Sequence, residues 1–352
     1  MSFSEEKKAG FLAIELDGAG YENLATAVLA AESAGFHVAT FADGRVPGRT
    51  NALQRAAFAG PVTRTIAVVP EVDTVYTEPF HISTQLASLD YVSGGRAGWI
   101  VTAAESPEAA AAVGRSSVVG AALAQEAAAS IEVGRRLWDS WEDDAVIRDV
   151  ATGRYIDVDK LHYADFETPS DFTGPGYSVK GPSIIPRPLQ GQLPVLAAAS
   201  LVGGGAVPAD AVDAVLVSAP TPELLAAEVR DVRARLGASV AVVAELDVVL
   251  DARGEAAVSR AGTLAANGRA RFVGSPADLT ELLDALLQEA DGVRLHPAVF
   301  DAELDELSRL VLPELRRRGS LRAPIQDGTF RELLGLAPAE NRYATTASGA
   351  GK

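Results

Sequence analysis

The sequence predicts an α/β protein assembled from parallel strand–helix units. Short apolar runs alternate with helical patterns along most of the chain, and eight of these runs have the length and composition of strands. Strands that alternate with helices indicate parallel βα units, and eight such units favour a closed barrel. Periodicity alone does not exclude an open, doubly wound sheet with the same order of elements.

Composition bounds the size and class of the protein. The 352 residues suffice for one large α/β domain or two smaller ones, and 48% hydrophobic residues indicate a sizeable core. A formal net charge of -16 disfavours nucleic acid and anionic membrane surfaces as partners. There is no cysteine, so disulfides, thiolate catalysis and cysteine–metal sites are excluded. No signal peptide or membrane-spanning run is visible, so a cytoplasmic location is expected.

Each expected strand is a short apolar run bounded by polar or glycine-containing turns. The run from residue 240 to 250 is unusually long for a strand. The eight expected strands are residues 11–16, 37–42, 64–72, 99–101, 194–199, 214–218, 240–250 and 292–295.

Helices are expected between the strands, and their ends carry recognisable signals. Pro79 suits the first turn of a helix that Gly94 ends, and Thr221 is a good N-cap for another. The alanine-rich stretch 107–141 predicts two helical pieces that are broken near Gly120. Further helices are expected at residues 21–34, 256–266, 279–289 and 302–318.

A long irregular stretch separates the fourth helix from the fifth strand. Residues 148–193 are rich in Pro, Gly, Asp and aromatic residues and show little periodicity. A loop of this length inside a compact domain is usually a lid or a binding insertion rather than a linker. Residues 337–352 are expected to form a loosely ordered tail.

One segment of the chain carries a resemblance to a known family. Residues 74–99 contain the spaced residues Thr74, Tyr76, Glu78, Pro79, Leu89, Asp90, Ser93, Gly95, Arg96, Gly98 and Trp99. In this pattern the chain resembles the flavin-dependent, bacterial-luciferase-like monooxygenases, particularly the branch that includes nitrilotriacetate monooxygenase. Further matches occur at residues 41–43, 137–143, 181–191 and 313–319, so the resemblance covers nearly the whole chain.

The resemblance implies a (β/α)8 barrel, formed here by a single domain of residues 1–336. It also implies a two-component monooxygenase, in which reduced FMN from a separate flavin reductase reacts with O2 to oxygenate a small organic substrate. Relatives commonly form homodimers, so a homodimer is expected. The insertion at 148–193 would then act as a lid.

In such a barrel, the active site lies at the carboxyl ends of the strands. That position selects Glu15, Asp17, Asp43, Glu71–Thr74, Thr102–Glu105, Ser200–Gly205, Ser218, Glu245–Asp247 and His296. The resemblance places Asp43, Thr74 and Thr102 beside the flavin, and Ser200, Leu201 and Gly203 at its phosphate. The glycines at 203–205 would let the backbone wrap that phosphate; the alternative is a plain surface turn. His296 is the candidate catalytic residue, and no residue spacing indicates a metal site.

Several polar positions of the family are replaced in this chain. The segment 99–104 lacks an asparagine and a serine, the segment 116–126 lacks His, Arg and Tyr, and residues 197–199 are all alanine. If each replacement removes a hydrogen bond worth ~1 kcal/mol, FMN would bind roughly two to four decades more weakly. Two further interpretations therefore stay open: a non-catalytic barrel that serves as partner subunit or ligand binder, and a deazaflavin (F420) oxidoreductase.

Overall fold

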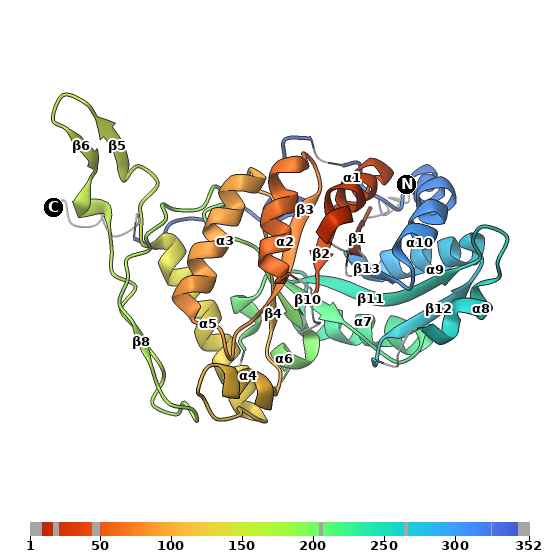
Figure 1. Cartoon of the computed structure of the whole chain (residues 1–352), viewed down its shortest axis with the longest axis horizontal. Helices are drawn as coiled ribbons and strands as arrows, with labels where there is room; N and C mark the ends of the chain where they lie inside the picture. Colours follow the sequence, from red (N-terminus) through yellow and green to blue (C-terminus); the bar gives the residue numbers. More distant parts are fainter. Residues whose placement is uncertain are drawn as a thin grey trace, which may run out of the picture.

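The computed structural model describes residues 9–16, 21–43, 50–203, 207–263, 267–324 and 326–343, and its centre is a closed barrel of parallel strands (Figure 1). Ring closure comes from β13, which pairs with β1 on one side and β11 on the other. The predicted barrel is thereby confirmed, and the open sheet is excluded. The eight strands of the ring are β1 (Phe11–Glu15), β2 (Val38–Phe41), β3 (Ala67–Asp73), β4 (Trp99–Thr102), β9 (Val195–Ala198), β10 (Ala214–Val217), β11 (Ala241–Leu250) and β13 (Gly292–Pro297).

The unusual length of β11 is explained by its two neighbours on one edge. Its first half pairs with β10, and its second half pairs with β12 (Ala270–Gly274) outside the ring. β12 was not among the strands expected from the sequence. The helix expected at 256–266 is wrong for most of its length, because the chain there forms only α8 (Ala257–Arg260) and the 3-10 turn η5 (Ala261–Thr263). Residues 264–266 lie outside the described residues.

The other expected helices are present, with ends close to the predicted ones. Gly35 and Gly94 cap two of them in the left-handed conformation, and Thr221 caps a third through its side chain. Among the residues described, no helix is both long and apolar enough to cross a membrane. The helices are α1 (Leu24–Ala34), α2 (Ala52–Ala59), α3 (Pro79–Ser93), α4 (Pro107–Ala112), α5 (Ala121–Asp139), α6 (Ala199–Gly203), α7 (Pro222–Leu236), α9 (Pro276–Glu289), α10 (Phe300–Glu306), the π-helical turn η6 (Leu307–Val311), α11 (Leu312–Arg317) and α12 (Phe330–Leu333), with 3-10 turns η1 (Tyr21–Asn23), η2 (Gly60–Val62), η3 (Val158–Lys160) and η4 (Ala209–Ala211).

The amino-terminal end of the barrel is filled by apolar side chains. Phe11 and Val69 point into the ring, and Phe330 of α12 packs against them from below. A Cβ atom at Gly98 would lie 2.5 Å from the Phe330 ring, and one at Gly292 would lie 2.6 Å from the Phe11 ring. Only glycine fits at these two positions. Because the amino end is filled in this way, a functional site is expected at the carboxyl end of the barrel.

Residues 140–194 form the insertion between α5 and β9. Two small antiparallel ladders organise it: β5 (Val146–Asp149) with β6 (Arg154–Ile156), and β7 (Phe166–Glu167) with β8 (Ser178–Val179). Figure 1 shows the first ladder at the far end of the insertion, away from the barrel. The second packs on α5, where Phe166 contacts the apolar side of that helix.

The expected loose tail needs a correction for its first residues. Asn341 is only 3% exposed, and its amide donates hydrogen bonds to the carbonyl oxygens of Asp139 and Trp141. The ring of Tyr343 stacks on His162 of the insertion at a centroid distance of 4.2 Å. Residues 337–343 are therefore attached to α5 and the insertion, while residues 344–352 lie outside the described residues.

Arg96, in the turn between α3 and β4, connects this turn to the segment 60–66 that precedes β3. Its guanidinium is buried and donates to the carbonyl oxygens of Gly60, Thr63 and Ile66. These acceptors lose their partner if the guanidinium is removed, and buried unpaired polar groups are costly.

We expect Arg96→Leu to lower the free energy of unfolding by about 3 kcal/mol, measured by urea denaturation. Arg154→Leu is the matched control, because that side chain is 53% exposed on β6 and should change stability by less than about 1 kcal/mol. Equal effects of the two substitutions would contradict this account of Arg96.

Candidate active site

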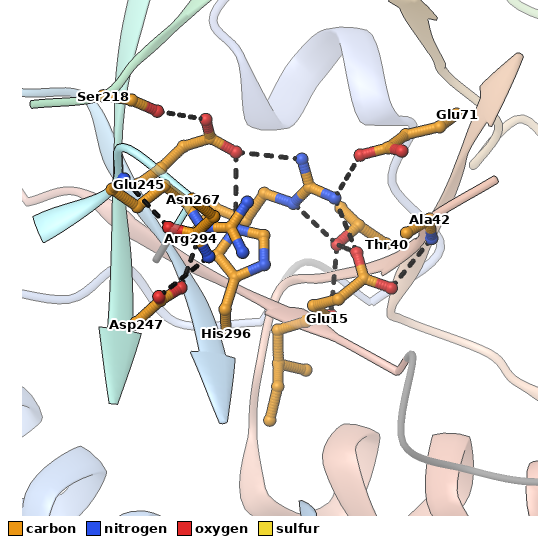
Figure 2. A network of polar contacts seen from close by, with 12 residues as sticks. Glu15, Thr40, Ala42, Glu71, Ser218, Glu245, Asp247, Asn267, Arg294 and His296 are labelled. Atoms are coloured by element: carbon orange, nitrogen blue, oxygen red, sulfur yellow. Dashed lines mark hydrogen bonds and ion pairs between the residues drawn. The ribbon is translucent and has the colours of Figure 1, made fainter. Parts of the chain in front are cut away.

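A buried guanidinium occupies the carboxyl end of the barrel (Figure 2). Arg294 of β13 is 2% exposed, and its Nη2 donates to Glu15 Oε2 at 2.6 Å and to Glu71 Oε1 at 2.8 Å. Its Nη1 donates to Glu245 Oε1 at 3.0 Å, and its Nε donates to Thr40 Oγ1 at 2.9 Å. We call Glu15, Thr40, Glu71, Ser218, Glu245, Arg294 and His296 the Arg294 cluster.

Strand alternation explains why these side chains meet. Gly292, Arg294 and His296 occupy alternate positions of β13 and face the barrel interior, whereas Val293 and Leu295 face the surrounding helices. The charged and hydroxyl partners come from β1, β2, β3 and β11, and parallel strands bring them to one level of the barrel, where Glu245 lies in register with Arg294.

The charges of the cluster are unequal in number, because three carboxylates face one guanidinium. Burial raises the pKa of Glu71 and Arg294 lowers it, but the neighbouring Glu15 adds to burial, so the net pKa lies above its usual value. Burial also raises the pKa of Glu245, yet His296 and Arg294 outweigh it and leave the pKa well below its usual value. Glu71 is therefore the carboxyl group of the cluster that most readily holds a proton.

His296 lies beside this network rather than in its centre. Its Nε2 is 3.3 Å from Glu245 Oε1, and its side chain is 10% exposed. Ser218, after β10, donates to Glu245 Oε2 at 2.6 Å, so Glu245 is held from two sides. This places His296 at the mouth next to an ionised carboxylate, and its catalytic role stays a prediction.

The three residues expected beside the flavin line one side of the mouth. Asp43 is exposed at the end of β2, and its backbone N–H donates to Glu71 Oε2 at 3.3 Å. Thr74 is buried, and its hydroxyl donates to the carbonyl oxygen of Thr102 at 3.0 Å. That hydroxyl proton is already used, so only the oxygen lone pairs of Thr74 remain for a ligand.

The three residues expected at the flavin phosphate belong to α6, which starts directly after β9. Ser200 is exposed, and its hydroxyl has no hydrogen-bond partner within the ranges described. The first backbone N–H groups of a helix lack intrahelical acceptors. Free N–H groups at Ser200 and Leu201 with one free hydroxyl are a donor set that fits a phosphate monoester. Gly203 is exposed at the end of α6, while Gly204, Gly205 and the candidate Asp17 lie outside the described residues.

A cavity of about 410 Å³ adjoins the mouth at Thr74. Its wall is formed by the loop from Thr74 to Pro79, by Arg115 before α5, by Glu126 of α5, and by residues 175–179 of the insertion. Three of the charged residues here were not predicted from the sequence: Arg115, Glu126 and Arg294. A lone arginine between apolar residues in 292–295 was the available signal for Arg294. In the described ranges, no group of three or more His, Asp and Glu side chains is placed to hold a metal ion.

We expect Arg294→Met to lower the free energy of unfolding at pH 7 by about 3–5 kcal/mol, because three buried carboxylates lose their counter-charge. The deficit should shrink on acidification, since the carboxylates then become protonated. Urea denaturation at several pH values measures both effects. Arg253→Met is the control, because Arg253 is 62% exposed with an ion pair to Asp305.

The opposite pKa shifts of Glu71 and Glu245 predict opposite responses to charge removal. A raised folded-state pKa means that ionised Glu71 reduces stability as the pH rises above the ordinary value of 4.5, so Glu71→Gln should cost less than about 1 kcal/mol at pH 7. A lowered pKa means that ionised Glu245 stabilises the fold above that pH and loses this effect in acid. Glu245→Gln should therefore cost about 2–3 kcal/mol at pH 7. Equal costs would refute the assignment of the proton to Glu71.

Comparison with known proteins identifies the family. Residues 9–326 match the model of the family described as luciferase-like monooxygenase. N-acetyl-S-(2-succino)cysteine monooxygenase of Bacillus subtilis (strain 168) is 36% identical over 158 residues, which are 45% of this chain and 34% of that protein. Nitrilotriacetate monooxygenase component A of Aminobacter aminovorans is 26% identical over 360 residues, covering 80% of this chain and 78% of that protein.

The architecture agrees with this match. A crystal structure of riboflavin lyase with modified FMN and substrate riboflavin superimposes with a TM-score of 0.78 at 20% identity, covering 94% of this chain and 97% of that chain. The match to the Bacillus protein spans only about a third of that relative's length. The family match extends from β1 to beyond α11, and the chain therefore belongs to the luciferase-like monooxygenase family, on the branch that includes nitrilotriacetate monooxygenase component A.

Proposed function

We propose that the protein is a flavin-dependent monooxygenase of the two-component type, which oxygenates a small organic substrate. The observation that carries the proposal is the polar mouth of the barrel, where the Arg294 cluster, free donors on α6 and an adjoining cavity lie within one rim. A barrel mouth filled by aliphatic side chains would leave no place for such chemistry. Here the aliphatic filling is at the opposite end.

Reduced FMN, bound at this mouth, would supply the electrons that activate O2. Ser200 and Leu201 would hold its phosphate through one hydroxyl and backbone N–H groups. Thr74 and Thr102 would border its ring system. The Arg294 cluster would border the same site, and Glu71, whose pKa is raised by burial, is its carboxyl group that most readily holds a proton.

The relatives support this reading without fixing the substrate. Their names include monooxygenases of nitrilotriacetate, dibenzothiophene sulfone and dimethyl sulfide, which share no functional group. We propose that a separate flavin reductase delivers the reduced cofactor, as in two-component relatives. We also propose that the insertion at 148–193 limits the access of water, because its β8 side borders the cavity at Thr74.

The direct test supplies reduced FMN from a flavin reductase and NADH under ¹⁸O2, with a panel of small ketones, thioethers and amines. One ¹⁸O atom in a product, detected by mass spectrometry, is the expected result. Absence of affinity for FMN in either redox state would overturn the proposal and favour the non-catalytic barrel.

We expect Ser200→Ala to weaken binding of reduced FMN by roughly five- to thirty-fold, because a hydrogen bond to a charged phosphate is lost. Binding of riboflavin, which lacks the phosphate, should stay unchanged. Anaerobic fluorescence titration measures both ligands. Ser308→Ala is the matched control, since the Ser308 hydroxyl bonds the Asp305 carbonyl at a distant helix. An equal loss for FMN and riboflavin would contradict the placement of the phosphate.

A further inference from the structure

The cavity beside Thr74 contains an ion pair between a half-buried arginine and a buried glutamate, and the proposed flavin site does not use it. Arg115 Nη2 lies 2.5 Å from Glu126 Oε1, and the two side chains are 30% and 2% exposed. Arg115 Nη1 also donates to the carbonyl oxygen of Val75, which fixes the guanidinium against the end of β3. Glu126 projects from α5, so the pair joins two walls of the cavity.

Arg115 lines the cavity and keeps donors beyond its described contacts. A guanidinium carries five N–H donors, and the described contacts of Arg115 use two groups, one toward Val75 and one toward Glu126. The side chain is 30% exposed, and the described lining residues include no second cation. A ligand with an oxygen acceptor would satisfy these donors.

The charge balance disfavours an anionic ligand. Glu126 already neutralises Arg115, and the carboxylate of Glu78 at the rim is engaged in capping α3. A carboxylate entering the cavity would therefore meet a net negative set of side chains. Burying an ion without a counter-charge is far more costly than burying a neutral acceptor.

The rest of the lining suits an apolar body. Val113, Pro175 and Val179 contribute apolar surface, and the ring of Tyr177 stands edge-on to Phe172 at 6.1 Å. A volume of about 410 Å³ lies at the lower end of the range for small-molecule pockets, roughly 300–1,000 Å³. The cavity thus fits a small molecule with one polar group.

We propose that this cavity is the substrate pocket and that the Arg115–Glu126 pair selects an uncharged substrate with a carbonyl-type oxygen. The inference rests on the proposed function, because it places the substrate next to Thr74 at the flavin mouth. It separates this protein from relatives whose names specify polycarboxylates, such as nitrilotriacetate and EDTA monooxygenases. Arg115 would position the substrate by donating a hydrogen bond to its oxygen. Glu126 would disfavour a negatively charged substrate.

Binding of matched neutral and anionic probes tests the proposal on the whole chain without flavin. Acetophenone and benzoate have nearly the same shape and differ in charge. Ligand-observed NMR titration up to roughly 10 mM covers the affinities of such fragments. We expect saturable binding of acetophenone and at least tenfold weaker binding of benzoate.

Glu126→Gln supplies the decisive variant. The amide keeps a hydrogen-bond acceptor for Arg115 but removes the negative charge, so the guanidinium becomes an uncompensated cation. Benzoate affinity should rise at least tenfold while acetophenone affinity changes less than about threefold. Arg115→Gln in the Glu126→Gln background should abolish this gain.

Glu132→Gln is the matched control on the same helix. Glu132 is 40% exposed, pairs with Arg136 and does not line this cavity, so its substitution should leave both affinities unchanged. Thermal unfolding of every variant shows whether the fold is intact.

Two results would overturn the inference: benzoate binding to the unaltered protein at least as tightly as acetophenone, or an unchanged preference in Glu126→Gln. Absence of saturable binding by either probe would also overturn it. Reduced-FMN binding is measured separately, so the two proposals can fail independently. Probe binding with the expected preference but without FMN affinity would support the proposed pocket and contradict the proposed monooxygenase function. FMN-dependent oxygenation with an unaltered probe preference in Glu126→Gln would support the monooxygenase function and contradict the proposed pocket.

Discussion

The burial of one guanidinium among three carboxylates constrains the whole barrel. Arg294 enters from β13, whereas Glu15, Glu71 and Glu245 come from β1, β3 and β11. These strands are consecutive neighbours in the order β3, β2, β1, β13 and β11, so the four charged groups meet only in the observed strand order and register. Buried charges without partners are strongly destabilising, and a shifted register would separate Arg294 from its acceptors. The register of this side of the barrel and the assembly of the mouth therefore depend on each other.

The two ends of the barrel divide stability and function between them. At the amino end, Phe11 and Phe330 fill the interior so closely that Gly98 and Gly292 cannot carry a side chain. Close packing of this kind supplies rigidity and hydrophobic stabilisation. At the carboxyl end, the interior positions of the same strands carry charge. The rigid lower half can thus support a polar upper half whose burial contributes little net stability.

The eight strands of the ring could be predicted from the sequence because their signal is local, whereas closure into a barrel was implied by the family resemblance. Apolar runs and glycine or proline boundaries define strands and helices without knowledge of distant contacts, and the eight ring strands follow from them. Only part of the Arg294 cluster could be predicted from the sequence. Its carboxylates were expected at the carboxyl ends of strands, whereas Arg294 lies inside a short apolar run that gave no such signal. β12 was missed because its five residues pair outside the ring. The binding of Asn341 to α5 depends on residues some 200 positions away, which no local pattern records.

The replaced family positions bear on whether the barrel is catalytic. Alanines stand at 197–199 and 103–104, where the family resemblance implies polar flavin contacts, and this loss is the reason for the alternative of a non-catalytic barrel. Arg115 and Glu126 nevertheless add charged groups beside the mouth, and they lie outside the strands of the ring. Buried ion pairs are weak contributors to stability, and apolar residues of similar volume often do as well or better. Because this pair lines a cavity next to Thr74, it supports the proposal that the mouth binds and orients a ligand through polar contacts other than the replaced ones.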